Sequence, residues 1–167
     1  EKTMLLPTSA SIVIALLMGI AGVFYVLWQL KQVFAYDQGN EVMQNIGKAI
    51  QEGASAFLGR EYRVIAIFVA IVATVICIFL QWQTAFCFVV GAIASAGAGY
   101  LGMYVAVRAN TRTAAAASRG LHEGLRVAFG SGSIMGMSVV SFSLIGMTLL
   151  YLIFSGDPNQ LVYITGF

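Results

Sequence analysis

The chain has 167 residues, of which 59% are hydrophobic and only 10% charged, and its mean hydropathy is +0.86. A soluble domain usually carries about 25% charged residues, so lipid rather than water is expected to surround most of this chain. The net charge of +2 is small and dispersed, which argues against nucleic-acid binding.

The first predicted element is a membrane-spanning helix over about Thr8–Leu30. No charged residue occurs from Thr3 to Leu30. At 1.5 Å per residue this helix would be about 34 Å long, enough to cross a hydrocarbon core of about 30 Å. Pro7 suits its first turn, and Trp28 suits the aromatic belt at its exit. The absence of a basic segment and a clear cleavage site favours a spanning helix over a signal peptide.

The next segment is predicted to be an amphipathic helix that runs into the second span. Apolar residues recur in it at three- and four-residue steps. They are Val42, Met43, Ile46, Ile50, Ala54, Phe57 and Leu58. Glu52 lies in this segment, and we interpret it as a structural acid in an i,i+4 or loop-to-loop salt bridge with an arginine such as Arg60, in preference to a functional acid.

Two spans are predicted in the uncharged run of 44 residues from Val64 to Val107, because one helix does not need that length. The second span is expected at about Val64–Leu80 and the third at about Ala85–Val107. The most polar point of the run, Gln81–Thr84, is the predicted turn between them.

The fourth span is expected at about Ser133–Phe154, closed by a turn over Ser155–Asn159. Before it, an alanine-rich stretch from Thr113 to Ser118 continues the helical pattern, with Gly120 and Gly124 as interruptions. The second, third and fourth spans are therefore expected to extend beyond the membrane as long helices. The fold class is all-α, a polytopic membrane helix bundle forming one transmembrane domain over residues 1–167.

The basic residues predict the orientation of this bundle. Eight of the nine Lys and Arg residues fall between the first and second spans or between the third and fourth. They are Lys31, Lys48, Arg60, Arg63, Arg108, Arg112, Arg119 and Arg126, while Lys2 lies elsewhere. Since positive loops stay in the cytoplasm, the segments from Lys31 to Arg63 and from Arg108 to Arg126 are expected there, and the N-terminus outside.

Small residues on the third and fourth spans predict close packing of helices. Gly91, Ser95 and Gly99 share one helix face in the third span. The fourth has Gly132, Gly136, Ser138, Ser141, Ser143 and Gly146. An ion path along these residues is a weaker interpretation, since the four spans carry no ionisable Asp, Glu, Lys, Arg or His between their ends.

No catalytic, cofactor-binding or metal-binding residue is assigned in this chain. His122 stands alone in a basic segment, typical of a surface or packing residue. The four arginines from Arg108 to Arg126 could attract an anionic substrate, but the positive-inside rule explains them without that role, and no substrate contact is assigned to them. Cys77 and Cys87 are interpreted as small apolar packing residues. The Gly130–Ser133 segment lacks the sequence of a phosphate-binding loop.

Four segments in order resemble the membrane-integral pyrophosphatases, the pyrophosphate-energised proton or sodium pumps. They are Ile50–Tyr62, Gly91–Met103, Val105–Ala117 and Val127–Gly136. The resemblance covers about residues 42–154. It implies a subunit of about sixteen spans arranged in an inner and an outer ring, a homodimer, and this chain as the first, outer-ring part.

The resemblance also implies an activity for the whole protein: hydrolysis of Mg²⁺-bound pyrophosphate on the cytoplasmic side, driving H⁺ or Na⁺ outward, with K⁺ as a possible activator. The family's hydrolytic residues lie on the fifth span and beyond, which is expected to begin near Tyr163–Phe167. None is transferred to this sequence. The expected location is a prokaryotic inner membrane, and the expected partners are the remaining helices of the same pump.

Two other classes of function stay open from the residues alone. A self-contained four-helix accessory or assembly protein would need no catalytic residues, and an independent channel would need a polar pore made by several copies. The run Leu161–Ile164 argues mildly against the first because it has no polar tail, and the second has only Ser and Gly residues in its favour.

Overall fold

A computed structural model describes residues 8–167, which form four long helices and one short one. The helices are α1 (Thr8–Ala35), α2 (Glu41–Phe79), α3 (Trp82–Ala117), α4 (Leu121–Ile153) and α5 (Gln160–Ile164). No strand occurs in this part of the chain. Each of the four long helices is long and apolar enough to cross a membrane. The all-α bundle with four candidate spans is therefore confirmed, while Pro7 and Lys2 lie outside the described residues.

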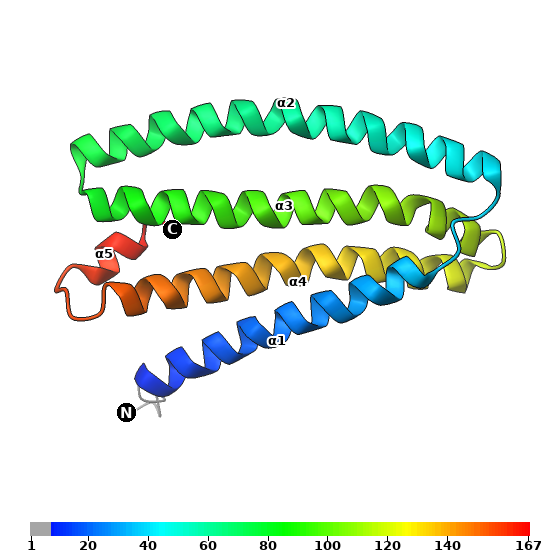
Figure 1. Ribbon diagram of the computed structural model, residues 1–167. Coiled ribbons are helices and arrows are strands. Elements are labelled where there is room, and N and C mark those ends of the chain that lie inside the picture. The colour runs from blue at the N-terminus through cyan, green and yellow to red at the C-terminus, as the bar shows by residue number, and fades with distance from the viewer. Residues whose placement is uncertain (1–7) are drawn as a thin grey trace.

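The long helices form an array in the order α2, α3, α4, α1 (Figure 1). Neighbours along the chain run in opposite directions, so the connections alternate between the two ends of the bundle. The links at residues 36–40 and 118–120 lie together at one end, here called the basic end. The link at residues 80–81 and helix α5 lie at the other. The alternation expected from the four spans is thus present.

The helices extend beyond the expected spans, as predicted. The amphipathic segment and the second span form one helix, α2, whose N-cap Asn40 accepts a hydrogen bond of 2.9 Å from the Met43 N–H. The alanine-rich stretch continues α3 to Ala117, because alanine has the highest helix propensity. The segments from Lys31 to Arg63 and from Arg108 to Arg126, expected to be cytoplasmic, therefore contain mostly helix, and the true loops are short.

Only one of the two predicted glycine interruptions breaks a helix. Gly120 precedes α4, whereas Gly124 lies inside it. A Cβ on Gly124 would lie 2.8 Å from Ala117 Cβ, so this glycine allows the ends of α3 and α4 to approach closely. The loop at residues 36–40 contains Gly39, whose φ of +80° is a backbone conformation that favours glycine.

The core lies where three helices meet near the basic end. Val26 and Val33 of α1 pack against Val105 and Ala109 of α3 and Ile134 of α4. A second cluster of Cys87, Leu150 and Tyr163 holds α5 against α3 and α4 at the other end. Helix α2 takes part in neither cluster.

The small residues of the third and fourth spans were predicted to pack against other spanning helices, and only some of them do. Ser141 is buried against Gly22 of α1, a close helix–helix contact of the expected kind. Gly146 instead faces the ring of Phe167, and Gly91 faces its backbone. Residues 160–167 therefore fold back onto α3 and α4 as a short helix and a turn, where a fifth span had been expected to begin.

Candidate functional site

A groove of about 430 Å³ lies between α2 and α3, towards the basic end. Helix α2 lines it with the face that carries Gln51, Ser55, Leu58 and Tyr62, which belongs to the predicted amphipathic segment. Helix α3 lines it with Tyr100, Met103, Tyr104 and Arg108. The groove therefore joins three of the segments that carry the family resemblance.

A row of side chains at i,i+4 spacing forms the α3 wall of the groove. The ring of Tyr100 stacks on that of Tyr104, with centroids 6.3 Å apart and planes inclined by 28°. The Arg108 guanidinium carbon lies 3.6 Å from the Tyr104 ring centroid, and Arg108 Nη1 donates to the Tyr104 carbonyl at 3.2 Å. This cation–π contact holds the charged group flat against the wall.

Tyr62 fixes the opposite wall. Its hydroxyl donates a hydrogen bond of 2.7 Å to the carbonyl of Ala96, and its ring meets the edge of Tyr100 at 6.3 Å. Gly99 leaves room for this approach, since a Cβ there would lie 3.5 Å from the Tyr62 hydroxyl. One end of the groove is thus closed by two tyrosines from different helices.

Arg112 lies one turn beyond Arg108 but is buried, with 9% of its surface exposed. Its Nη1 donates to the Arg108 carbonyl at 2.6 Å, and its guanidinium carbon lies 5.1 Å from the centroid of the Phe34 ring. Its Nε has no partner among the described residues. Arg112 therefore anchors the end of α1 against α3, and its burial argues against direct attraction of a substrate from solution.

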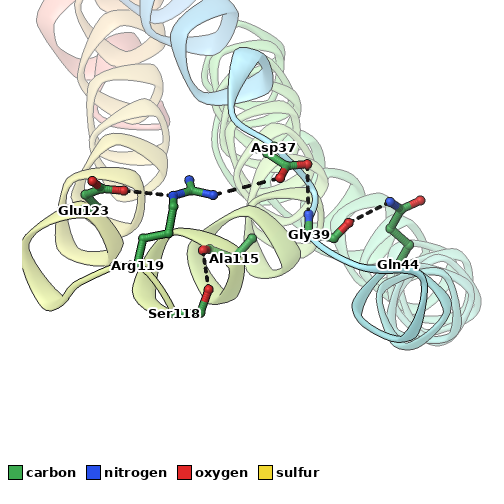
Figure 2. A network of polar contacts seen from close by, with 7 residues as sticks. All are labelled: Asp37, Gly39, Gln44, Ala115, Ser118, Arg119 and Glu123. Atoms are coloured by element: carbon green, nitrogen blue, oxygen red, sulfur yellow. Dashed lines mark hydrogen bonds and ion pairs between the residues drawn. The ribbon is translucent and has the colours of Figure 1, made fainter.

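Arg119 links the two loops at the basic end (Figure 2). Its Nε donates to Glu123 Oε2 at 3.0 Å, and its Nη1 lies 3.9 Å from Asp37 Oδ2. Asp37 Oδ1 in turn accepts from the Gly39 N–H at 3.2 Å, and the Gly39 carbonyl accepts from Gln44 Nε2 at 2.9 Å. Because the three charged groups are exposed, this network is weak and sensitive to salt.

The ion pair predicted for Glu52 is wrong. Both Glu52 and Arg60 are exposed, and the ion pairs of the described residues involve only Arg119. Their separation of eight positions corresponds to about 12 Å along one helix, too far for an ion pair. Lys48, at i,i+4 spacing, does not pair with Glu52 either.

The other candidate residues do not converge on a catalytic centre. His122 and Arg126 are exposed on α4. Cys87 is buried, as expected of a packing residue, but Cys77 is exposed on α2. Within residues 8–167, no group of three or more His, Cys, Asp or Glu residues could hold a metal ion.

The groove and its aromatic wall were not predicted from the residue types. The spacing of Tyr100, Tyr104 and Arg108 places them on one helix face, which was a usable signal. Their meeting with Tyr62 depends on how α2 lies against α3, and no local pattern contains that information.

Comparison with known proteins identifies relatives over nearly the same region. Residues 20–167 match the sequence model of a family described as inorganic H+ pyrophosphatase. The chain is 45% identical over 142 residues to the K(+)-insensitive pyrophosphate-energized proton pump 2 of Moorella thermoacetica, which covers 84% of this chain. It is 39% identical over 148 residues to the K(+)-insensitive pyrophosphate-energized proton pump of Methanosarcina mazei, which covers 87% of this chain.

A sodium pump is also among the relatives. The chain is 43% identical over 125 residues, or 74% of its length, to the K(+)-stimulated pyrophosphate-energized sodium pump of Thermotoga maritima. The matches cover 21%, 22% and 17% of these three relatives respectively. The chain thus spans about a fifth of the length of the relatives it matches.

Proposed function

Because this chain belongs to the inorganic H+ pyrophosphatase family, we propose that it is the first part of a larger membrane pump that couples pyrophosphate hydrolysis to outward transport of H⁺ or Na⁺. The observation that carries this proposal is the family match over residues 20–167. Four helices that could span a membrane accord with it, and the chain is an integral membrane protein of the multi-pass kind.

Within that pump, the proposed role of this segment is scaffold. The charged residues of the described chain lie in the segments 31–63 and 108–126 and at Asp157, outside the four uncharged runs, and a pump needs ionisable groups along its ion path. No catalytic residue is assigned to any position in this sequence. The segment would hold the remaining helices of the same subunit in an outer ring and contribute surface to a homodimer.

The proposed cofactor is Mg²⁺, bound together with pyrophosphate by parts of the pump outside this chain. Such a metal ion polarises the phosphoryl group that is attacked by water. The three relatives differ in their response to K⁺, since one is named K(+)-stimulated and two are named K(+)-insensitive. A role for K⁺ in this pump is therefore left to the assay with and without K⁺.

The proposed orientation places the basic end in the cytoplasm and the N-terminus outside, in a prokaryotic inner membrane. The positive-inside rule supports it, because the eight basic residues from Lys31 to Arg126 fall in the segments 31–63 and 108–126, which contain the two short loops at the basic end. Accessibility of single cysteines at Ser118 and Ser155 to a membrane-impermeant reagent tests this arrangement. Labelling of position 118 from the outside would contradict it.

The function is tested on the full-length product of the gene that encodes this chain. Reconstituted into liposomes with Mg²⁺, it is expected to release phosphate from pyrophosphate and to transport H⁺ or Na⁺, with and without K⁺. An intact product of about the mass of this chain that lacks hydrolysis would instead support a self-contained accessory protein. That alternative is not favoured, because the matched relatives are named pyrophosphate-energized pumps. Conductance without pyrophosphate would indicate a channel.

A further inference from the structure

The groove between α2 and α3 carries positive charge without a partner. Arg108 forms no ion pair among the described residues, although its guanidinium is held against Tyr104. Lys48 is exposed one turn beyond Gln51, on the side of α2 that lines the groove. No Asp or Glu lines the groove. The site therefore has the chemistry to hold an anion.

The groove changes from charged to apolar in the direction of the membrane. Long side chains on a helix lean towards its N-terminus, and the N-terminus of α3 is at the far end of the bundle from Arg108. The Arg108 guanidinium accordingly lies over Tyr104, inside the uncharged run that ends at Val107. Leu58 and Met103 line the groove beyond the Arg108 guanidinium. The exposed Arg60 and Arg63 follow Leu58 within about 8 Å along α2.

We propose that this groove binds an anionic phospholipid, with the lipid phosphate at Arg108 and an acyl chain along Leu58 and Met103. Basic pockets between membrane helices are suited to anionic lipid headgroups, and tyrosines favour the headgroup level. The order of charge, tyrosine and apolar surface along the groove is the order of groups in a phospholipid. This inference requires a membrane-embedded chain and does not depend on pump activity.

The charge and the length of the groove suit a lipid. The lining of α2 from Gln51 to Tyr62 corresponds to about 16 Å of helix, and the volume of the groove is about 430 Å³. An acyl chain is narrow enough to enter. A helix of the same pump packed over the groove would leave no room for a lipid, and the retention measurement below distinguishes these two occupants.

The test is lipid retention by the full-length protein, measured by native mass spectrometry after incubation with phosphatidylglycerol or phosphatidylcholine. The wild type is expected to retain phosphatidylglycerol preferentially. Arg108→Gln is expected to lower that retention about fivefold, and Arg126→Gln, which removes an exposed arginine of α4 away from the groove, is expected to leave it unchanged. Equal retention of the two lipids, or equal effects of the two variants, overturns the proposal.

A second pair of variants keeps the test valid if Arg108→Gln does not fold. Gly59 lines the groove and Gly53 does not, and a Cβ at either position meets no atom within 4 Å. Gly59→Trp is expected to displace the lipid, and Gly53→Trp to retain it. Loss of phosphatidylglycerol in excess inorganic phosphate would overturn the proposal in favour of a soluble-anion site. Failure of the pump assay in the wild type would affect the proposed function alone.

Discussion

Helix α1 meets α4 through glycine and serine, whereas α2 meets α3 through tyrosines beside an open groove. Ser141 is fully buried in the first interface, where it faces Gly22. In α2 the only buried residue is Gly47. The first interface thus excludes other molecules, while the second leaves room for lipid. The difference suggests that α1, α3 and α4 form the rigid part of this segment, with α2 attached along one side.

Gly22→Leu is expected to have the largest effect on this comparison. A Cβ at Gly22 would overlap Ser141 Oγ, and contacts at Gly19 and Gly130 hold α1 on either side, so the helix cannot tilt away locally. We expect destabilisation at or above about 3 kcal/mol, the upper range for overpacking. The measurement is the midpoint of thermal unfolding of the full-length protein in detergent. Gly136→Leu is the control, since a Cβ there meets nothing within 4 Å; equal shifts would contradict the close α1–α4 interface.

Gly47→Leu tests the corresponding close contact of α2. A Cβ at Gly47 would overlap Thr111 Cγ2 on α3, but α2 has no other buried residue, so it can shift outward at the loss of few packed contacts. We expect a smaller cost of about 1–2 kcal/mol, measured by the same thermal midpoint, together with loss of the phosphatidylglycerol preference. Gly53→Leu should change neither. A cost equal to that of Gly22→Leu would show that α2 is held as tightly as α1.

Tyr62→Phe removes the hydrogen bond to the Ala96 carbonyl and keeps the ring. We expect a loss of about 0.5–1 kcal/mol, because hydrogen bonds between membrane helices contribute little beyond this. Tyr25→Phe is the matched control, as its hydroxyl lies 3.3 Å from Ser133 Oγ in an exposed contact between α1 and α4. If Tyr25→Phe costs more than Tyr62→Phe in thermal unfolding, the closing role given to Tyr62 is incorrect.

Arg119→Gln is expected to have the smallest effect. It removes the contacts to Asp37 and Glu123, which are exposed and worth at most about 1 kcal/mol. The difference from wild type in the thermal midpoint should shrink as salt is added, because the charges become screened. Arg126→Gln provides the comparison, and a loss that does not depend on salt would indicate a packing role for Arg119.

Local sequence was sufficient to predict the number of candidate spans, their approximate bounds and the alternation of their connections. Spanning length and the exclusion of charge from lipid are local requirements, so each segment carries them on its own. The four family-like segments also indicated the family, because each is a continuous run of residues whose resemblance does not depend on folding. The ends of α3 and α4 were harder to place, because alanine-rich and glycine-containing stretches are helical or not according to what they pack against.

The contacts between helices, by contrast, required the folded arrangement. The burial of Arg112 beside Phe34, the absence of a partner for Glu52 among the described residues, and the groove between Tyr62 and Arg108 all depend on how separate helices lie against one another. In lipid, apolar faces give little guidance on this point, because a helix is as well solvated by acyl chains as by leucines. Helix order and register are then set by small residues and a few polar contacts, whose partners lie far away in the sequence.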